Sequence, residues 1–150
     1  MMIRRVFCLS LLVLVLTQAG CKQIWSIVGS HIDANVPDAK DFDNFLKRDL
    51  TNYVTDSKDK DISVNIELLR KEPTQSGVAL PKFYIWLQKL DANGNVMEEA
   101  ALRIAAVEKT HFDVVQYYEK ARVLKEQDLI YKVFPTDVAD KIMERAKKSE

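Results

Sequence analysis

The chain has 150 residues, of which 22 are lysine or arginine and 22 are aspartate or glutamate, so its formal net charge is zero. This balance gives no electrostatic reason to expect a nucleic-acid partner. The two cysteines are Cys8 and Cys21, so the chain beyond them contains neither a disulfide nor a thiolate metal site.

The first 21 residues follow the pattern of a secretory signal peptide. Arg4 and Arg5 supply positive charge, an apolar run extends from Val6 to Leu16, and small residues precede Cys21. The apolar run is too short to span a membrane, which takes about 20 residues. We therefore predict that residues 1–20 are a signal peptide.

The end of this segment, Ala19-Gly20-Cys21, resembles the lipobox of bacterial lipoprotein signal peptides, with Gln18 where the family usually has an aliphatic residue. The resemblance implies cleavage before Cys21 and diacylation of that cysteine, which then becomes the new N-terminus. In the family's sorting logic, Lys22 favours the outer membrane over the inner membrane. The alternatives are an ordinary secretory signal cut near Ala19 and an uncleaved hydrophobic anchor.

Residues 21–37 show no sustained periodicity, and we predict a tether that leads to one globular domain at residues 38–150. Trp25 in this tether either sits at the lipid interface or packs onto the domain. Apolar residues then recur at spacings of three and four, which predicts a helix over residues 39–55. Its buried face comprises Phe42, Phe45, Leu46, Leu50, Tyr53 and Val54, and its opposite face, expected in solvent, carries Asp41, Asp43, Lys47, Arg48 and Asp49.

Alternating apolar and polar residues predict two strands, one over residues 62–68 and one over residues 82–90. The second strand has apolar side chains on both sides, so we expect a central strand covered on both faces. Asparagine and glycine within residues 91–95 predict a hairpin turn. Residues 96–108 fit both a strand and a helix, and the hairpin turn favours a strand over residues 99–107.

The rest of the chain is predicted to be helical. Thr110 and Asp113 resemble the start of a helix that continues to Leu124. Residues 129–134 form an apolar plug, and Thr136 begins a last helix. Together the elements predict an α+β fold, in which an N-terminal helix and C-terminal helices pack on a small antiparallel sheet of three or more strands.

Few residues have the pattern of a catalytic site. His111 has Asp113 nearby in sequence, and Asp137 or Asp140 are further candidate neighbours. However, no serine or cysteine lies in a nucleophile motif. We therefore predict no catalytic residue, no metal, no cofactor and no enzymatic activity.

Two acidic arrangements are poor candidates for chemistry. Glu98 and Glu99 are adjacent, so a strand directs them to opposite faces, which makes a poor acid and base pair. Asp91, Asn93 and Asn95 resemble the start of a calcium loop, but the glycine and glutamate that such a loop requires are missing. A hairpin turn explains these three residues better.

Aromatic residues are the remaining candidates for contact with a partner, because tryptophan and tyrosine dominate protein interfaces. We predict Tyr84 and Tyr117 as contacts with a protein partner. For Trp86 and Tyr118 we favour packing in the core.

The stretches Ile62 to Ile66 and Phe83 to Leu90, with Gly77 and Pro81 between them, resemble the opening strands of the outer-membrane lipoprotein of type VI secretion systems. The resemblance implies a β-sandwich that docks onto an inner-membrane partner. The leading prediction is a non-enzymatic interaction module in an envelope assembly, of which a secretion system is the candidate example. The alternative is an envelope inhibitor or immunity protein that blocks a toxin or lytic enzyme through the loop at residues 74–78.

Overall fold

A computed structural model describes residues 35–55, 61–77 and 79–148. The predicted signal peptide, Cys21 and residues 21–34 of the predicted tether lie outside the described residues. Within the described ranges, no helix is both long enough and apolar enough to cross a membrane.

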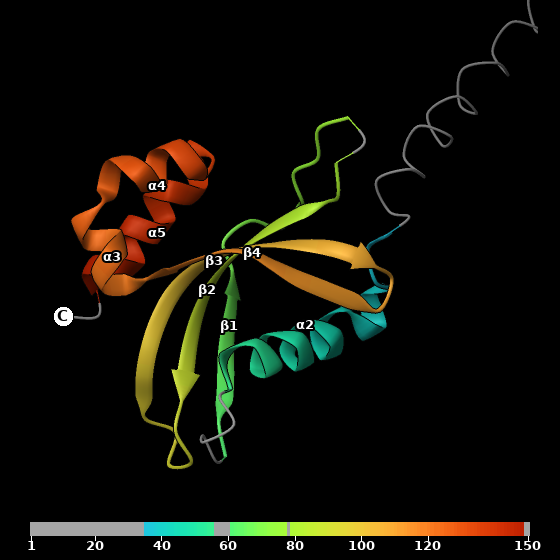
Figure 1. Cartoon of the computed structure of the whole chain (residues 1–150), viewed down its shortest axis with the longest axis horizontal. Helices are drawn as coiled ribbons and strands as arrows, with labels where there is room; N and C mark the ends of the chain where they lie inside the picture. Colours follow the sequence, from blue (N-terminus) through green and yellow to red (C-terminus); the bar gives the residue numbers. More distant parts are fainter. Residues whose placement is uncertain (1–34, 56–60, 78, 149–150) are drawn as a thin grey trace, which may run out of the picture. The chain divides into compact units, whose positions relative to one another are not determined.

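Helix α2 (Ala39–Val54) lies across one face of the sheet (Figure 1). The predicted helix over residues 39–55 is confirmed, and Leu46 and Leu50 on its inner side are almost fully buried. The prediction that Tyr53 is buried on the same side is wrong, since 53% of it is exposed. Tyr53 lies in the last turn of the helix, where its ring is 5.8 Å from that of Tyr117.

The sheet is antiparallel, and its strands lie in sequence order: β1 (Ser63–Leu68), β2 (Lys82–Leu90), β3 (Val96–Glu108) and β4 (His111–Glu119). The predicted strand at 82–90 matches β2 at both ends, and the one at 62–68 matches β1 to within one residue. Residues 96–108 form a strand over their whole length, as the preceding hairpin turn favours. This strand is longer than the predicted range of 99–107.

The predicted hairpin turn between β2 and β3 is confirmed. Oδ1 of Asp91 accepts hydrogen bonds from the amides of Asn93 and Asn95, at 2.9 and 2.8 Å. Gly94 has a φ of 82°, which glycine adopts at no steric cost. The side chain of Asp91 therefore organises the turn.

The sheet is covered on both faces, as predicted for its central strand. On one face, α2 packs on a core that includes Phe83, Ile85 and Leu87 of β2. On the other face, Tyr84 and Trp86 of β2 join a second core with the C-terminal helices. The predicted α+β fold is confirmed. The C-terminal helices are α3 (Lys120–Lys125), α4 (Gln127–Val133) and α5 (Thr136–Lys148).

The predicted helix from Thr110 to Leu124 is wrong over most of its length. Residues 111–119 form strand β4, and helix α3 begins only at Lys120. Thr110 lies in the turn that joins β3 to β4, so it does not begin a helix.

A bulge in β4 explains why its sequence resembles a helix. Val115 is the extra residue of this bulge, opposite Arg103 and Ile104 of β3. A bulge interrupts the two-residue alternation of a strand. Phe112 and Tyr118 consequently belong to the cores on opposite faces of the sheet. The apolar residues 112, 115 and 118 recur at a spacing of three, which resembles a helix, but they lie in a bulged strand.

The variants Phe112→Ala and Val115→Ala test this placement of β4. Phe112 is 3% exposed, and its ring centroid lies 5.1 Å from that of Phe42. Its truncation should lower the free energy of unfolding by about 3–5 kcal/mol. Val115 is 43% exposed, so its truncation should change that energy by less than about 0.5 kcal/mol. Urea denaturation measures both, and equal losses would contradict the strand.

Candidate functional site

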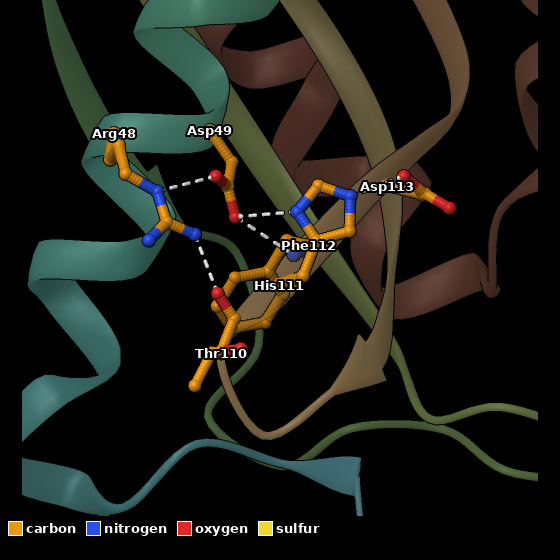
Figure 2. Close-up of polar contacts among 6 residues, drawn as sticks. All are labelled: Arg48, Asp49, Thr110, His111, Phe112 and Asp113. Atoms are coloured by element: carbon orange, nitrogen blue, oxygen red, sulfur yellow. Dashed lines mark hydrogen bonds and ion pairs between the residues drawn. The ribbon is translucent and has the colours of Figure 1, made fainter.

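A polar junction fastens α2 to the turn between β3 and β4 (Figure 2). The Asp49 carboxylate accepts hydrogen bonds from Nε of Arg48 at 2.8 Å and from the Phe112 amide at 2.9 Å. Nη2 of Arg48 donates to the Thr110 carbonyl oxygen at 2.5 Å. The prediction that Asp49 lies in solvent is wrong, because its side chain is only 7% exposed. Its amide partner is 63 residues away in the sequence, so helical periodicity gave no signal for this role.

His111, the first residue of β4, lies between two carboxylates at this junction. Its Nδ1 is 3.3 Å from Oδ2 of Asp49, and its Nε2 is 2.8 Å from Oδ1 of Asp113. The contact with Asp113 is a hydrogen bond, and the contact with Asp49 is an ion pair only if the ring is protonated. His111 therefore contacts α2 from the first position of β4.

The other acidic residues considered as neighbours of His111 do not join it. Asp137 lies 3.7 Å from Arg70, and Asp140 accepts a hydrogen bond from the Tyr131 hydroxyl at 2.8 Å. Both aspartates belong to α5, which packs on the face opposite α2. Within the described ranges, no group of three or more His, Cys, Asp or Glu side chains is placed to hold a metal ion. We interpret the junction as a structural joint.

The pKa of Asp49 lies below its ordinary value of 3.8. Burial alone would raise the pKa, but the hydrogen bonds from Arg48 and the Phe112 amide, together with the charges of Arg48 and His111, outweigh burial. A lowered pKa means that the ionised form is favoured in the folded protein. The resulting stability is present above pH 3.8 and is lost as the pH falls through the folded pKa.

Tyr84, one of the two tyrosines predicted to contact a partner, is buried. It is 4% exposed, its hydroxyl contacts that of Thr74, and its ring lies 6.0 Å from the ring of Phe134. The prediction of a surface role for Tyr84 is wrong, because helices cover this face of β2. Trp86 and Tyr118, which we expected in the core, are 3% and 8% exposed.

Tyr117, the other predicted contact, is half-buried on the edge strand β4. Its hydroxyl donates a hydrogen bond to Oε1 of Glu98 at 2.6 Å. Burial raises the pKa of Tyr117, and the hydrogen bond to Glu98 raises it further. The more accessible ring of this aromatic pair belongs to Tyr53, which the helical pattern assigned to the core.

Glu98 and Glu99 point to opposite faces of β3, as predicted. Glu98 accepts the hydrogen bond from Tyr117 on the α2 side. Glu99 accepts one from Gln88 at 2.9 Å and lies 3.3 Å from Lys120. The two carboxylates therefore do not act on one substrate atom.

A cavity of about 100 Å³ lies where α5 meets β1 and β2. Nη2 and Nε of Arg145 donate to the carboxylate of Glu67 at 2.6 and 2.8 Å across this cavity. These hydrogen bonds lower the pKa of Glu67. The volume is well below the roughly 300 Å³ of small-molecule sites. The lining residues are Asn65, Glu67, Trp86, Gln88, Arg145 and Lys148.

Comparison with known proteins gives no relative from which a function could be transferred. No protein-family model matches the chain, and neither a curated protein nor a solved structure matches it significantly. A fold class alone does not define a function, so the function must be argued from the residues of this chain.

The variant Asp49→Asn tests the junction through its pH dependence. The substitution removes the negative charge that Arg48 and His111 contact. The free energy of unfolding at neutral pH should therefore fall by about 1–3 kcal/mol. The gap from wild type should shrink as the pH falls below about 4, because the wild-type carboxylate then takes up a proton.

Urea denaturation across this pH range measures the effect. Asp43→Asn is the matched control, because Asp43 lies on the exposed side of the same helix. A loss at Asp49→Asn that is equal at every pH would show that the charge of Asp49 is not the cause.

Proposed function

We propose that this chain is a lipid-anchored lipoprotein of the bacterial cell envelope, whose domain faces the periplasm and acts as a non-enzymatic protein-interaction module. The observation that carries the proposal is the segment from Ile3 to Cys21. Positive charge, an apolar run, small residues and a cysteine follow one another there in the order of a lipoprotein signal peptide. Lys22 favours the outer membrane.

The physical chemistry of acyl chains supports a permanent anchor. Each buried methylene contributes about 0.8 kcal/mol, and a single chain binds a membrane only reversibly. Two or three chains on Cys21 hold the protein permanently. The folded domain is then free to bind partners while it remains close to the membrane surface.

The contacts of the domain support binding rather than catalysis. His111, Glu98 and Glu99 are engaged in contacts that join elements of the fold. Exposed aromatic rings, at Tyr53 and Tyr131, are of the kind that protein interfaces use. These features suit a module that recognises another protein of the envelope.

The resemblance to the type VI secretion lipoprotein covers strands β1 and β2 only. In the described residues these strands belong to a single four-stranded sheet with helices on both faces, whereas that family is a β-sandwich. The proposed role in an envelope assembly therefore rests on the proposed lipid anchor. A secretion system is one assembly in which this role can be tested.

Purification of the native protein from membranes tests the proposal. Intact mass should show that the chain begins at Cys21 and carries acyl chains, and cross-linking in cells should recover an envelope protein. Cys21→Ala should abolish acylation and membrane retention. Cys8→Ala is the matched control and should abolish neither, because Cys8 lies in the segment that is removed.

An unacylated wild-type chain that is recovered in the soluble fraction would refute the anchor. Recovery of a toxin or a lytic enzyme as the cross-linked partner would favour the envelope inhibitor or immunity protein over the assembly module.

A further inference from the structure

One row of side chains across the sheet has incomplete hydrogen bonding. In the described ranges, Oε1 of Gln75, Nε of Arg103 and Oε1 of Gln116 are buried without a partner. Arg103 of β3 lies opposite Gln116 of β4 on one side and opposite Tyr84 of β2 on the other. Native proteins pair nearly all buried polar groups, so two unpaired atoms on one cross-strand pair, Arg103 and Gln116, are unusual.

The same row contains two half-buried cations, Lys82 and Arg103. Lys82 lies two residues before Tyr84 on β2, so it faces the same side of the sheet as Arg103. Burial lowers the pKa of Lys82, and the charge of Arg103 lowers it further, so the two charges repel. Nη1 of Arg103 donates to the carbonyl oxygen of Val133 at 3.3 Å, which is a neutral partner.

Among the described residues, neither cation has a carboxylate oxygen within 4.0 Å. Two other half-buried cations of the domain do: Lys120 lies 3.3 Å from Glu99, and Arg145 lies 2.6 Å from Glu67. A half-buried charge without a counter-ion costs free energy. The stability of the fold therefore gives no reason for placing Lys82 beside Arg103.

We propose that Lys82 and Arg103, here called the Arg103 row, bind a carboxylate on the protein partner. This inference rests on the proposed function and states the chemistry of the partner. A carboxylate presents two oxygens that match the guanidinium fork. The unpaired Nε of Arg103 belongs to that fork, and the ammonium of Lys82 adds a second positive charge. The row therefore suits an aspartate or glutamate side chain.

NMR titration of the acylated full-length protein in neutral detergent tests the inference. The probes are a blocked peptide that contains two glutamates, the same peptide with glutamines, and inorganic phosphate. The Nε–H resonance of Arg103 should shift with the glutamate peptide and not with the glutamine peptide. A response to phosphate alone, or to none of the probes, would overturn the proposal.

The variants Arg103→Gln and Lys82→Gln should each weaken binding of the glutamate peptide about tenfold, which corresponds to about 1.4 kcal/mol. Lys82→Gln should also raise the Tm of the free protein, because it removes the repulsion between the cations. Lys109→Gln is the matched control, since it removes one exposed positive charge elsewhere. A lower Tm for Lys82→Gln with unchanged peptide binding would show a merely structural role.

Cross-linking of Arg103→Gln in cells separates this inference from the proposed function. A variant that stays acylated but loses the partner supports both. A variant that stays acylated and captures the partner as wild type does overturns the Arg103 row while the proposed function stands. If the wild type itself is not acylated, the proposed function fails, and the same peptide titration with the unacylated chain still decides the carboxylate site.

Discussion

The structure depends on one constraint: strands β2 and β3 carry apolar side chains on both faces. A single sheet of this kind has no face that tolerates water, so helices must cover both sides. Ala100 and Ala106 of β3 face α2, and Ala101 faces the C-terminal helices, all fully buried. Small side chains on the central strand let the helices on both faces approach the sheet closely.

Elements whose pattern is local were predictable from the sequence. The alternation in β2 and the spacing of Leu46 and Leu50 in α2 report which sides are buried, because each pattern reflects the geometry of one element. The turn at Asp91 was predictable for a similar reason, since its hydrogen bonds close within five residues. The ambiguity of β3 was resolved by its neighbour, because a hairpin turn requires a second strand.

Features that depend on distant contacts were not predictable. The bulge at Val115 makes a strand resemble a helix, and only pairing with β3 reveals it. Asp49 occupies a polar position of α2, yet it binds the Phe112 amide of β4. The wrong prediction of a surface role for Tyr84 has another cause. A strand that is covered on both faces buries its tyrosine as well as its aliphatic side chains. The strand pattern already argued against a surface role for that residue.

Two polar arrangements of the domain differ in a way that bears on function. At the Asp49 junction, each charge has a partner, so the arrangement is complete and holds the fold together. At the Arg103 row, two cations lie on the paired strands β2 and β3, and Nε of Arg103 is buried without a partner among the described residues. Strands place side chains more rigidly than loops do, which lowers the entropy lost on binding. The proposed lipid anchor would further raise the effective concentration of a membrane-bound partner, so a single well-placed carboxylate contact would contribute to recognition without high intrinsic affinity.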